Sequence, residues 1–503
     1  MKTQHTDTAG TPAVPPSPAH SKRKGWLAGI GAIIVVVLLV GLSALVFAQL
    51  RQHQANQSTT STPPSGQWKQ VLQGYAITSI AAARSNPSVL YACAMQAPVT
   101  SQASPGSPTV LRSTDFGDHW QDIGSKASIG NTCELAVNPA DSNEIYVVGA
   151  ASSSQSSAVL KHSTDGGQTW ETIQPVLHVP GIHAPAVWFI QQIQLEGTHL
   201  FGLQWILPRA YINQPIKAVP YLLPRLVTST DGGHNWTVID GQFSSQKLGV
   251  RSYAVDPTDP NTIYALFGGV LLPIEVAVPN DVLPAFGFKQ ELFKTTDGGA
   301  TWHLVLNNIP FGSQVQLASG NPRIIYVGGT FGPLPLLRGE TEPADPIPVA
   351  SSFHLQVSKD GGASWQLVAI PSDMLSIQNW YVSPGGQVYA SPTIPFNGQP
   401  TAVAGTAVAV TAVPIPTRNP QNAELPPQQN SPSGVHTSGV PVALSQIIRR
   451  YDPASNSWSD VTRPPAAGFM LQVTPAQANS GAILWFSSMD NGRASLSLYR
   501  YVV

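Results

Sequence analysis

An eight-residue pattern that ends in tryptophan recurs along this 503-residue chain and sets narrow limits on its fold. The copies read STDFGDHW from Ser113, STDGGQTW from Ser163, STDGGHNW from Ser229, TTDGGATW from Thr295 and SKDGGASW from Ser358, with a degenerate YDPASNSW from Tyr451. Aspartates of the first five copies are 50 to 66 residues apart. Repeats of this size, each long enough for several short strands, predict a β-propeller.

Each repeat has the same order of predicted strands. An apolar strand, a Pro/Asn/Gly turn and a strand that usually carries Tyr are followed by a third strand leading into the octet, and the Trp begins a fourth. Seven such hairpins are found. The missing seventh octet is explained by the chain ends, because SGQWKQV at 65–71 resembles a fourth strand and the C-terminal LSLYRYVV a third. We therefore expect seven four-stranded blades, with Trp68 in the strand that closes the ring.

The octet resembles the Asp box of the BNR-repeat propellers. This superfamily includes sialidases, sortilin-type receptors, xyloglucan-degrading hydrolases and photosystem II assembly-factor-like proteins. The resemblance implies that each box is the turn between the third and outermost strands. Such a turn suits an Asp that accepts amide hydrogen bonds and a Gly pair that permits positive φ, while the Trp packs between blades. We assign structural roles to Asp115, Trp120, Asp165, Trp170, Asp231, Trp236, Asp297, Trp302, Asp360 and Trp365.

Residues 26–48 form a run of 23 residues without a charge. At about 1.5 Å per residue this run can cross a hydrocarbon core of about 30 Å. The basic cluster at 22–24 precedes it, which predicts a cytoplasmic N-terminus and an extracytoplasmic propeller at the plasma membrane. A cleaved signal peptide is the alternative, with Ala48 at the cleavage site. We expect a disordered tail at 1–25, a transmembrane helix at 26–48, a linker at 49–65 and the propeller at 66–503.

Charge and cysteine content narrow the choice of partners. Charged residues make up 11% of the chain and the formal net charge is -1, which argues against a nucleic-acid partner. The two cysteines, Cys93 and Cys133, form either one disulfide outside the cytoplasm or two buried thiols. Neither has the spacing of a metal site, and we expect no metal and no cofactor.

The long connections all fall on one face. First-to-second and third-to-fourth connections share the face of the boxes and are short, whereas second-to-third connections leave the opposite face, which we call the loop-rich face. In blades three, four and five these connections have about twenty residues each, and a low-complexity insertion occupies 392–442 in blade six. Their apolar, Pro-rich composition indicates packing, either on one another or against a ligand. Candidate binding residues there are Trp205, Arg209, Tyr211, Arg251, Glu275 and Arg338.

Two enzymatic alternatives use residues of the same face. A sialidase needs three arginines around a carboxylate and a Tyr–Glu pair, for which Arg209, Arg251 and Arg338 with Tyr211 and Glu275 are conceivable. The Arg-Ile-Pro signature of sialidases is missing, and Arg84 and Arg323 fall in turns on the box face. A xyloglucan-degrading hydrolase needs two carboxylates across a cleft. The acids in suitable loops are Glu275, Asp281, Glu340, Glu342 and Asp345.

The sequence therefore favours a membrane-anchored, extracytoplasmic binding or assembly scaffold that contacts a protein or carbohydrate ligand through the loop-rich face. Its long apolar loops carry this interpretation, and Trp205 is suited to stack on a sugar. An exo-acting, sialidase-like glycoside hydrolase is the alternative. Fold resemblance alone does not decide between them, because one fold carries many functions.

Overall fold

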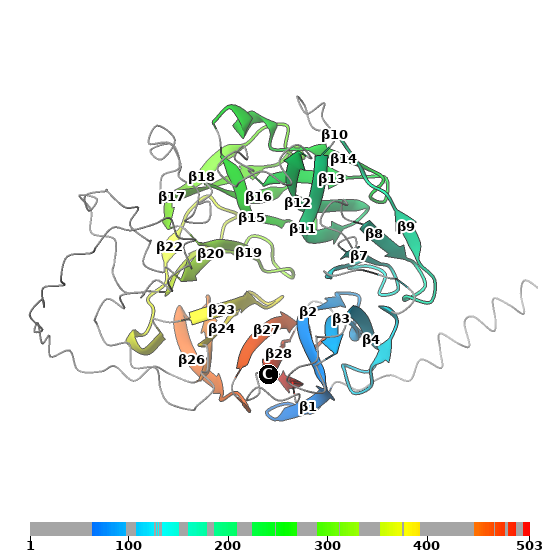
Figure 1. The fold of residues 1–503 in the computed structure, drawn as a ribbon. Coiled ribbons are helices and arrows are strands. Elements are labelled where there is room, and N and C mark those ends of the chain that lie inside the picture. The colour runs from blue at the N-terminus through cyan, green and yellow to red at the C-terminus, as the bar shows by residue number, and fades with distance from the viewer. Residues whose placement is uncertain are drawn as a thin grey trace, which may run out of the picture. The chain divides into compact units, whose positions relative to one another are not determined.

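Seven sheets follow one another along the unit Thr62–Val503 in a computed structural model, and they stand around a central axis (Figure 1). The expected all-β, seven-bladed propeller is thus confirmed. The structure describes residues 63–503 except 97–106, 125–126, 128, 130–132, 150–158, 179–185, 209–223, 247, 269–288, 311, 331–352, 375–376, 393–446, 467, 478–480 and 489–495.

The first three blades follow the predicted hairpins. Blade one contains β2 (Tyr75–Ala83), β3 (Asn86–Gln96), β4 (Pro108–Ser113) and β5 (Gln121–Asp122). Blade two contains β6 (Glu134–Val137), β7 (Ile145–Gly149), β8 (Val159–Ser163) and β9 (Glu171–Ile173). Blade three contains β11 (Ala186–Glu196), β12 (His199–Pro208), β13 (Arg225–Ser229) and β14 (Asn235–Val238).

The remaining blades repeat this order. Blade four contains β15 (Gly249–Val255), β16 (Ile263–Gly268), β17 (Lys289–Thr295) and β18 (His303–Pro310). Blade five contains β19 (Gln314–Leu317), β20 (Ile325–Thr330), β21 (Phe353–Ser358) and β22 (Gln366–Leu367). Blade six contains β23 (Ile377–Val382), β24 (Val388–Pro392), β25 (Ile448–Asp452) and β26 (Ser457–Thr462). Short 3₁₀ helices, η4 (Gly241–Gln246) and η6 (Ser372–Met374), precede blades four and six.

Blade three departs from the expected four strands. The short strand β10 (Val176–His178), which precedes the blade in sequence, pairs in parallel with β14, so this sheet has five strands. Three residues are too few to give a periodic apolar pattern, which is why the sequence did not reveal β10. The extra strand covers β14 and becomes the outer edge of blade three.

Blade seven is assembled from both ends of the unit, as the sequence predicted. It contains β27 (Gly468–Thr474), β28 (Ile483–Ser488), β29 (Ser497–Val502) and, as its outer strand, β1 (Trp68–Gln73). Trp68 lies opposite Tyr501 in the antiparallel register. Beyond the strand ends, the Gly66 amide donates to the Val502 carbonyl at 2.9 Å. The ring is therefore closed by backbone hydrogen bonds between segments more than 400 residues apart.

One buried apolar cluster fills each of the seven interfaces between neighbouring blades, and each cluster includes a Trp at or just before an outermost strand. Trp236 and Trp302 are buried, whereas the other five are half-buried. In order of the interfaces from blades seven/one to six/seven, these residues are Trp120, Trp170, Trp236, Trp302, Trp365, Trp458 and Trp68. Each blade thus packs one large aromatic face against the blade before it.

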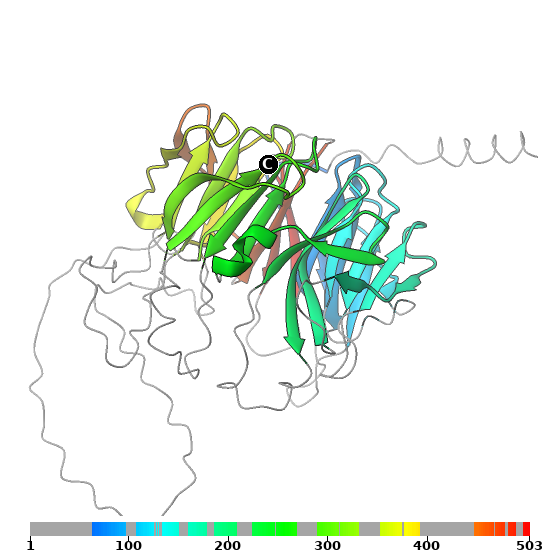
Figure 2. The same cartoon turned by 90° about the horizontal axis from the view of Figure 1, so that it is seen from above.

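The boxes and the first-to-second turns share one face of the ring. In blades two and five the box amides of Gly166 and Gly361 donate to carbonyls of the first-to-second turn, Asn143 and Arg323, at 2.9 and 3.0 Å. Because the strands are antiparallel, each second strand ends at the opposite face, where the long connections begin. Figure 2 shows the blades from the side.

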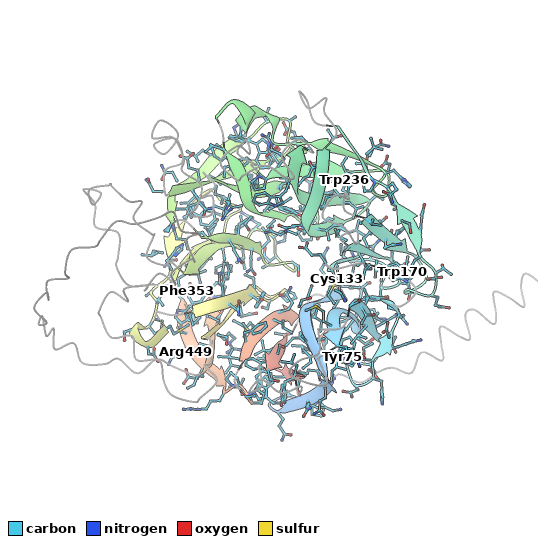
Figure 3. All side chains as sticks on the ribbon, viewed as in Figure 1. Tyr75, Cys133, Trp170, Trp236, Phe353 and Arg449 are labelled. Atoms are coloured by element: carbon cyan, nitrogen blue, oxygen red, sulfur yellow. A yellow bond between two sulfur atoms is a disulfide. The ribbon has the colours of Figure 1, made fainter. Side chains whose placement is uncertain are left out.

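A disulfide joins Cys93 of β3 to Cys133, the residue before β6, with an S–S distance of 2.00 Å. It therefore links blade one to blade two. Cys93 is fully buried, and Figure 3 shows Cys133 nearer the centre of the ring than Trp170 or Trp236.

Several predictions concern segments outside the described residues. The tail at 1–25, the helix expected at 26–48, most of the linker and almost all of the insertion at 392–442 are among them. Within the described part of the chain, no helix has the length and apolar character needed to span a bilayer.

We expect Trp236→Ala to lower the free energy of unfolding by about 3–5 kcal/mol, because it leaves a cavity between blades two and three. Trp365→Ala is the matched control, since Trp365 is half-buried and should lose less. Chemical denaturation followed by circular dichroism measures both. Equal losses would contradict the inter-blade packing described above.

Removing the disulfide with Cys93→Ala and Cys133→Ala should cost about 4 kcal/mol, from the entropy of closing a 40-residue loop in the unfolded chain. Dithiothreitol should lower the denaturation midpoint of the native protein and leave that of the double variant unchanged. A native protein that is insensitive to the reductant would contradict the prediction.

Candidate functional site

The five intact boxes share one hydrogen-bond network that uses both oxygens of the aspartate. In the second box the Ser163 hydroxyl donates to Asp165 Oδ1 at 2.8 Å and accepts the Gly167 amide at 2.8 Å. Asp165 Oδ1 also accepts the Thr169 amide at 2.9 Å, and Oδ2 accepts the Thr169 hydroxyl at 2.6 Å. The same pattern occurs in the other four boxes, where the carboxylate bonds with the backbone amide and the side chain of the residue four positions later. These aspartates are Asp115, Asp231, Asp297 and Asp360.

These bonds stabilise the ionised carboxylates. Hydrogen bonds from the residue four positions on lower the pKa of Asp165, Asp231, Asp297 and Asp360 to about 2. At Asp115 partial burial acts in the opposite sense, but hydrogen bonds from His119 outweigh it and the pKa is lowered. A carboxylate held this way is a poor proton donor at neutral pH, so the boxes serve the architecture of the turn.

The degenerate sixth box has a different turn. Asp452 accepts the Ala454 amide at 3.0 Å, and the Tyr451 hydroxyl donates to Asn456 Oδ1 at 2.7 Å. Asn456 has a φ of 50°, a conformation that Asn tolerates better than most residues. Trp458 still packs between blades five and six, so the interface is kept although the box chemistry is lost.

Two of the six candidate binding residues lie within the described part of the chain. Trp205 is on β12, half-buried and opposite Phe189 of β11. Arg251 is on the innermost strand of blade four, at a bulge between Val250 and Ser252, and burial lowers its pKa. They stand on adjacent blades in the half of the ring nearer the loop-rich face. Arg209, Tyr211, Glu275 and Arg338 lie outside the described residues, as do Asp281, Glu340, Glu342 and Asp345.

Sequence reasoning missed a polar contact along the inner wall of the ring. Glu134 of β6 accepts the Gln192 amide at 2.5 Å, and the Tyr253 hydroxyl donates to the Gln192 carbonyl. Burial raises the pKa of both Glu134 and Tyr253. Gln192 has a φ of 53° within a bulge of β11, which exposes its backbone groups to blades two and four. These bonds join the innermost strands β6, β11 and β15. No sequence motif predicts them.

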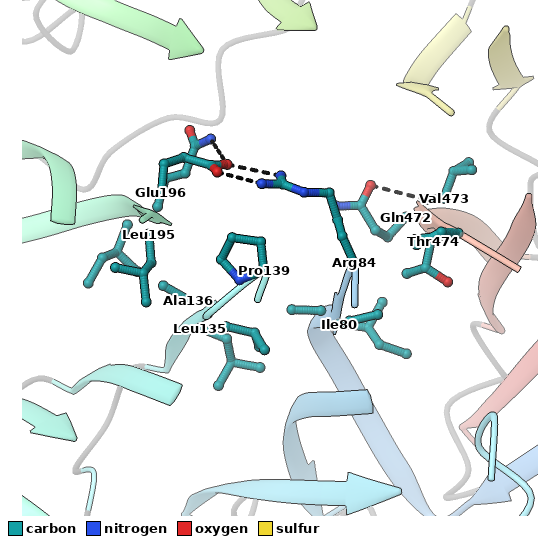
Figure 4. Close-up of a pocket in the computed structure, with 16 residues that line it drawn as sticks. Ile80, Arg84, Leu135, Ala136, Pro139, Leu195, Glu196, Gln472, Val473 and Thr474 are labelled. Carbon is teal, nitrogen blue, oxygen red and sulfur yellow. Dashed lines mark hydrogen bonds and ion pairs between the residues drawn. The ribbon is translucent and has the colours of Figure 1, made fainter. Parts of the chain in front are cut away.

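A cavity of about 280 Å³ opens among the innermost strands β27, β2, β6 and β11 (Figure 4). Its lining comes from the last residues of these strands and the turns that follow, so it lies toward the box face. Much of the lining is aliphatic: Ile80, Leu135, Ile193, Leu195 and Val473, with Pro139 and Pro475. The sequence had directed attention to the loop-rich face, and this cavity is on the other side.

An ion pair spans the cavity between blades one and three. Arg84 Nη1 donates to Glu196 Oε1 at 3.0 Å and Nη2 to Oε2 at 2.5 Å, while Gln194 Nε2 donates to Oε1 at 3.1 Å. The Glu196 side chain is 4% exposed and that of Arg84 22%. Figure 4 shows the pair lying above Pro139 of blade two, with Gln472 of blade seven beside Arg84.

The sequence placed Arg84 correctly in a turn of the box face but gave no sign of its partner. Glu196 is 112 residues away and is the last residue of β11. The one signal in the sequence is that an acid ends the innermost strand of blade three, two blades after Arg84. Only an alignment of the blades with one another would show this. Among the described residues, no three His, Cys, Asp or Glu side chains are grouped as a metal site.

Comparison with known families agrees with the repeat. The family model described as "BNR/Asp-box repeat" matches residues 161–172, which contain the second box and the start of the outer strand. The box network, the seven blades and this match occur together. The chain is a seven-bladed β-propeller that carries Asp-box (BNR) repeats.

This Asp-box propeller also resembles several individual proteins. A xyloglucanase from Paenibacillus sp. is 29% identical over 147 residues, which cover 26% of this chain and 13% of the xyloglucanase. The solved structure of YCF48 from Cyanidioschyzon merolae has a TM-score of 0.43 at 11% identity and covers 87% of this chain and 99% of its own. An ancestral GH74 enzyme has a TM-score of 0.41 at 15% identity, covering 86% of this chain and 48% of its own.

The box pKa values predict the acid response of the Asp-box propeller. A folded pKa of about 2 lies below the ordinary 3.8, so these carboxylates stabilise the fold above about pH 4 and lose that contribution as the pH falls toward 2. We expect the thermal midpoint to be level from pH 6 to 5 and to fall between pH 4 and 2. Asp231→Asn should flatten this fall, and an unchanged pH profile would contradict the assignment.

Proposed function

We propose that this Asp-box propeller is an extracytoplasmic binding or assembly scaffold, anchored to the membrane by residues 26–48, which contacts a protein or glycan through its loop-rich face. The main support is the length of the second-to-third connections, about twenty residues each in blades three to five, all leaving the same face. Short turns occupy the other face, where the boxes bond to them.

The use of the described carboxylates favours binding over catalysis. The aspartates of the intact boxes have both oxygens engaged by their own turn. Of the acids along the inner wall, Glu134 is bonded to backbone and Glu196 is paired with Arg84. A glycosidase requires two carboxyl groups that face each other across a substrate. The box aspartates are instead engaged within their own turns, and Glu134 and Glu196 join strands of different blades.

A glycoside hydrolase remains the second candidate because of one observation, the 29% identity with a xyloglucanase over 147 residues. The acids that such a reaction would need in this chain, Glu275, Asp281, Glu340, Glu342 and Asp345, belong to the loop-rich face by sequence position. Both candidates therefore use the same face of the ring and differ in what happens to the bound sugar.

Site-specific photo-crosslinking tests the proposed face. The photoreactive residue p-benzoylphenylalanine replaces Trp205 in one version of the full chain and Leu367, which is 70% exposed on the outer edge of blade five, in the control. Expressed in the native host and irradiated, the version substituted at 205 should give a discrete adduct that the control lacks. No adduct from position 205, or the same adduct from both positions, would contradict the proposal.

A parallel assay separates the scaffold from the hydrolase. The purified full chain is incubated with xyloglucan, and release of reducing ends is measured over hours. We expect no release above that of a heat-denatured sample. Release that is abolished by Glu275→Gln would replace the scaffold proposal with the hydrolase.

A further inference from the structure

We propose that the cavity near the box face is a second binding site, and that it takes one uncharged sugar ring. This site is separate from the loop-rich face: its lining comes from the ends of β27, β2, β6 and β11 and from the short turns beyond them. Its ligand class follows from charge, hydrogen-bonding capacity, apolar lining and size.

Charge excludes strongly ionic ligands. Arg84 and Glu196 are the charged residues of the lining, and their formal charges cancel in a two-pronged ion pair. Glu196 is 3% exposed as a residue, so a ligand that drew Arg84 away would leave a buried carboxylate without its counterion. The site therefore favours a neutral ligand over a phosphate, a carboxylate or an amine.

The polar edge of the cavity both donates and accepts hydrogen bonds. The Arg84 guanidinium has five N–H groups, and two of them donate to Glu196. The Glu196 carboxylate has about four acceptor positions, and hydrogen bonds from Arg84 and Gln194 occupy three of them. The amides of Gln194 and Gln472 add further donors and acceptors. Hydroxyl groups match such an edge because each one donates and accepts.

The remaining lining is apolar and faces this polar edge. Half-buried Pro139 lies below the ion pair in Figure 4, with Ala136, Leu135 and Ile80 below it, and the aliphatic residues of the lining also pack in the inter-blade clusters. A pyranose ring has hydroxyls around its edge and C–H groups on its faces, so it can satisfy both parts of the lining. An aliphatic side chain from a partner protein would cover the polar edge without hydrogen-bonding to it, which is costly.

The size of the cavity suits one ring. A water molecule takes up about 30 Å³ of liquid, so the cavity of about 280 Å³ holds the equivalent of about nine waters. This is near the lower limit of small-molecule pockets, which begin at about 300 Å³. A single pyranose fits, whereas a longer glycan would bind by its terminal unit.

Saturation-transfer NMR on the purified full chain tests the proposal with two probes of the same ring size. Methyl β-D-glucopyranoside presents several hydroxyls, and cyclohexanol presents one. We expect the glucoside to bind with a Kd on the order of 1 mM and cyclohexanol to bind at least about tenfold more weakly. Preferential binding of cyclohexanol would mark a merely apolar cavity and overturn the proposal.

Three variants locate the binding. Arg84→Gln should weaken glucoside binding about tenfold, because the ion-paired donor is lost. Arg323→Gln is the matched control, an arginine in the corresponding turn of blade five, and should leave binding unchanged. Ala82→Trp keeps the ion pair and fills the cavity from half-buried Ala82, so it should abolish binding.

Thermal melting of each variant separates loss of the site from loss of the fold. Should Arg84→Gln fail to fold, Ala82→Trp still provides the test. Glucoside binding that survives in a folded Ala82→Trp protein would place the sugar elsewhere, and absence of glucoside binding to the native chain would refute the site. Neither result bears on the crosslinking at Trp205, which probes the opposite face.

Discussion

Closure of the ring is the constraint on which the rest of this structure depends. A blade alone would expose an apolar face and an open sheet edge to water, so an isolated blade would not be stable. Here each blade buries a Trp against the blade before it, and the series ends only because β1 pairs with β29. Trp68 then occupies at the last interface the place that the box tryptophans occupy at the others.

Closure also divides the molecule into two faces with different chemistry. The aspartates and hydroxyls of the boxes bond within their own turns, and box amides bond to the neighbouring first-to-second turns, so the connections on this face are short and closely bonded. The second-to-third connections on the other face are long in the sequence, and long loops are where a scaffold would acquire specificity. The cavity under Arg84 and Glu196 adds a small recess near the otherwise rigid face.

The fold was predictable because its signals are local and repeated. The Asp and Gly residues of a box act within one turn, and Trp68 near Tyr501 could be anticipated from a missing octet and two incomplete chain ends. The parallel strand β10 was not predictable, since three residues give no period. Nor was the Arg84–Glu196 pair, because blades one and three meet only through the curvature of the ring. At the loop-rich face, sequence composition indicated where a ligand could bind but not how the residues are arranged. Of the six candidate residues there, the structure describes Trp205 and Arg251.

Amide hydrogen exchange across β1 and β29 tests the central claim most directly. If the ring is closed by this pair, the inward-bonding amides of 68–73 should be protected to the same degree as those of the inner strands, and should lose protection together with 497–502 as denaturant is added. Exchange of 68–73 at the rate of an unfolded peptide, while the other blades stay protected, would contradict the account.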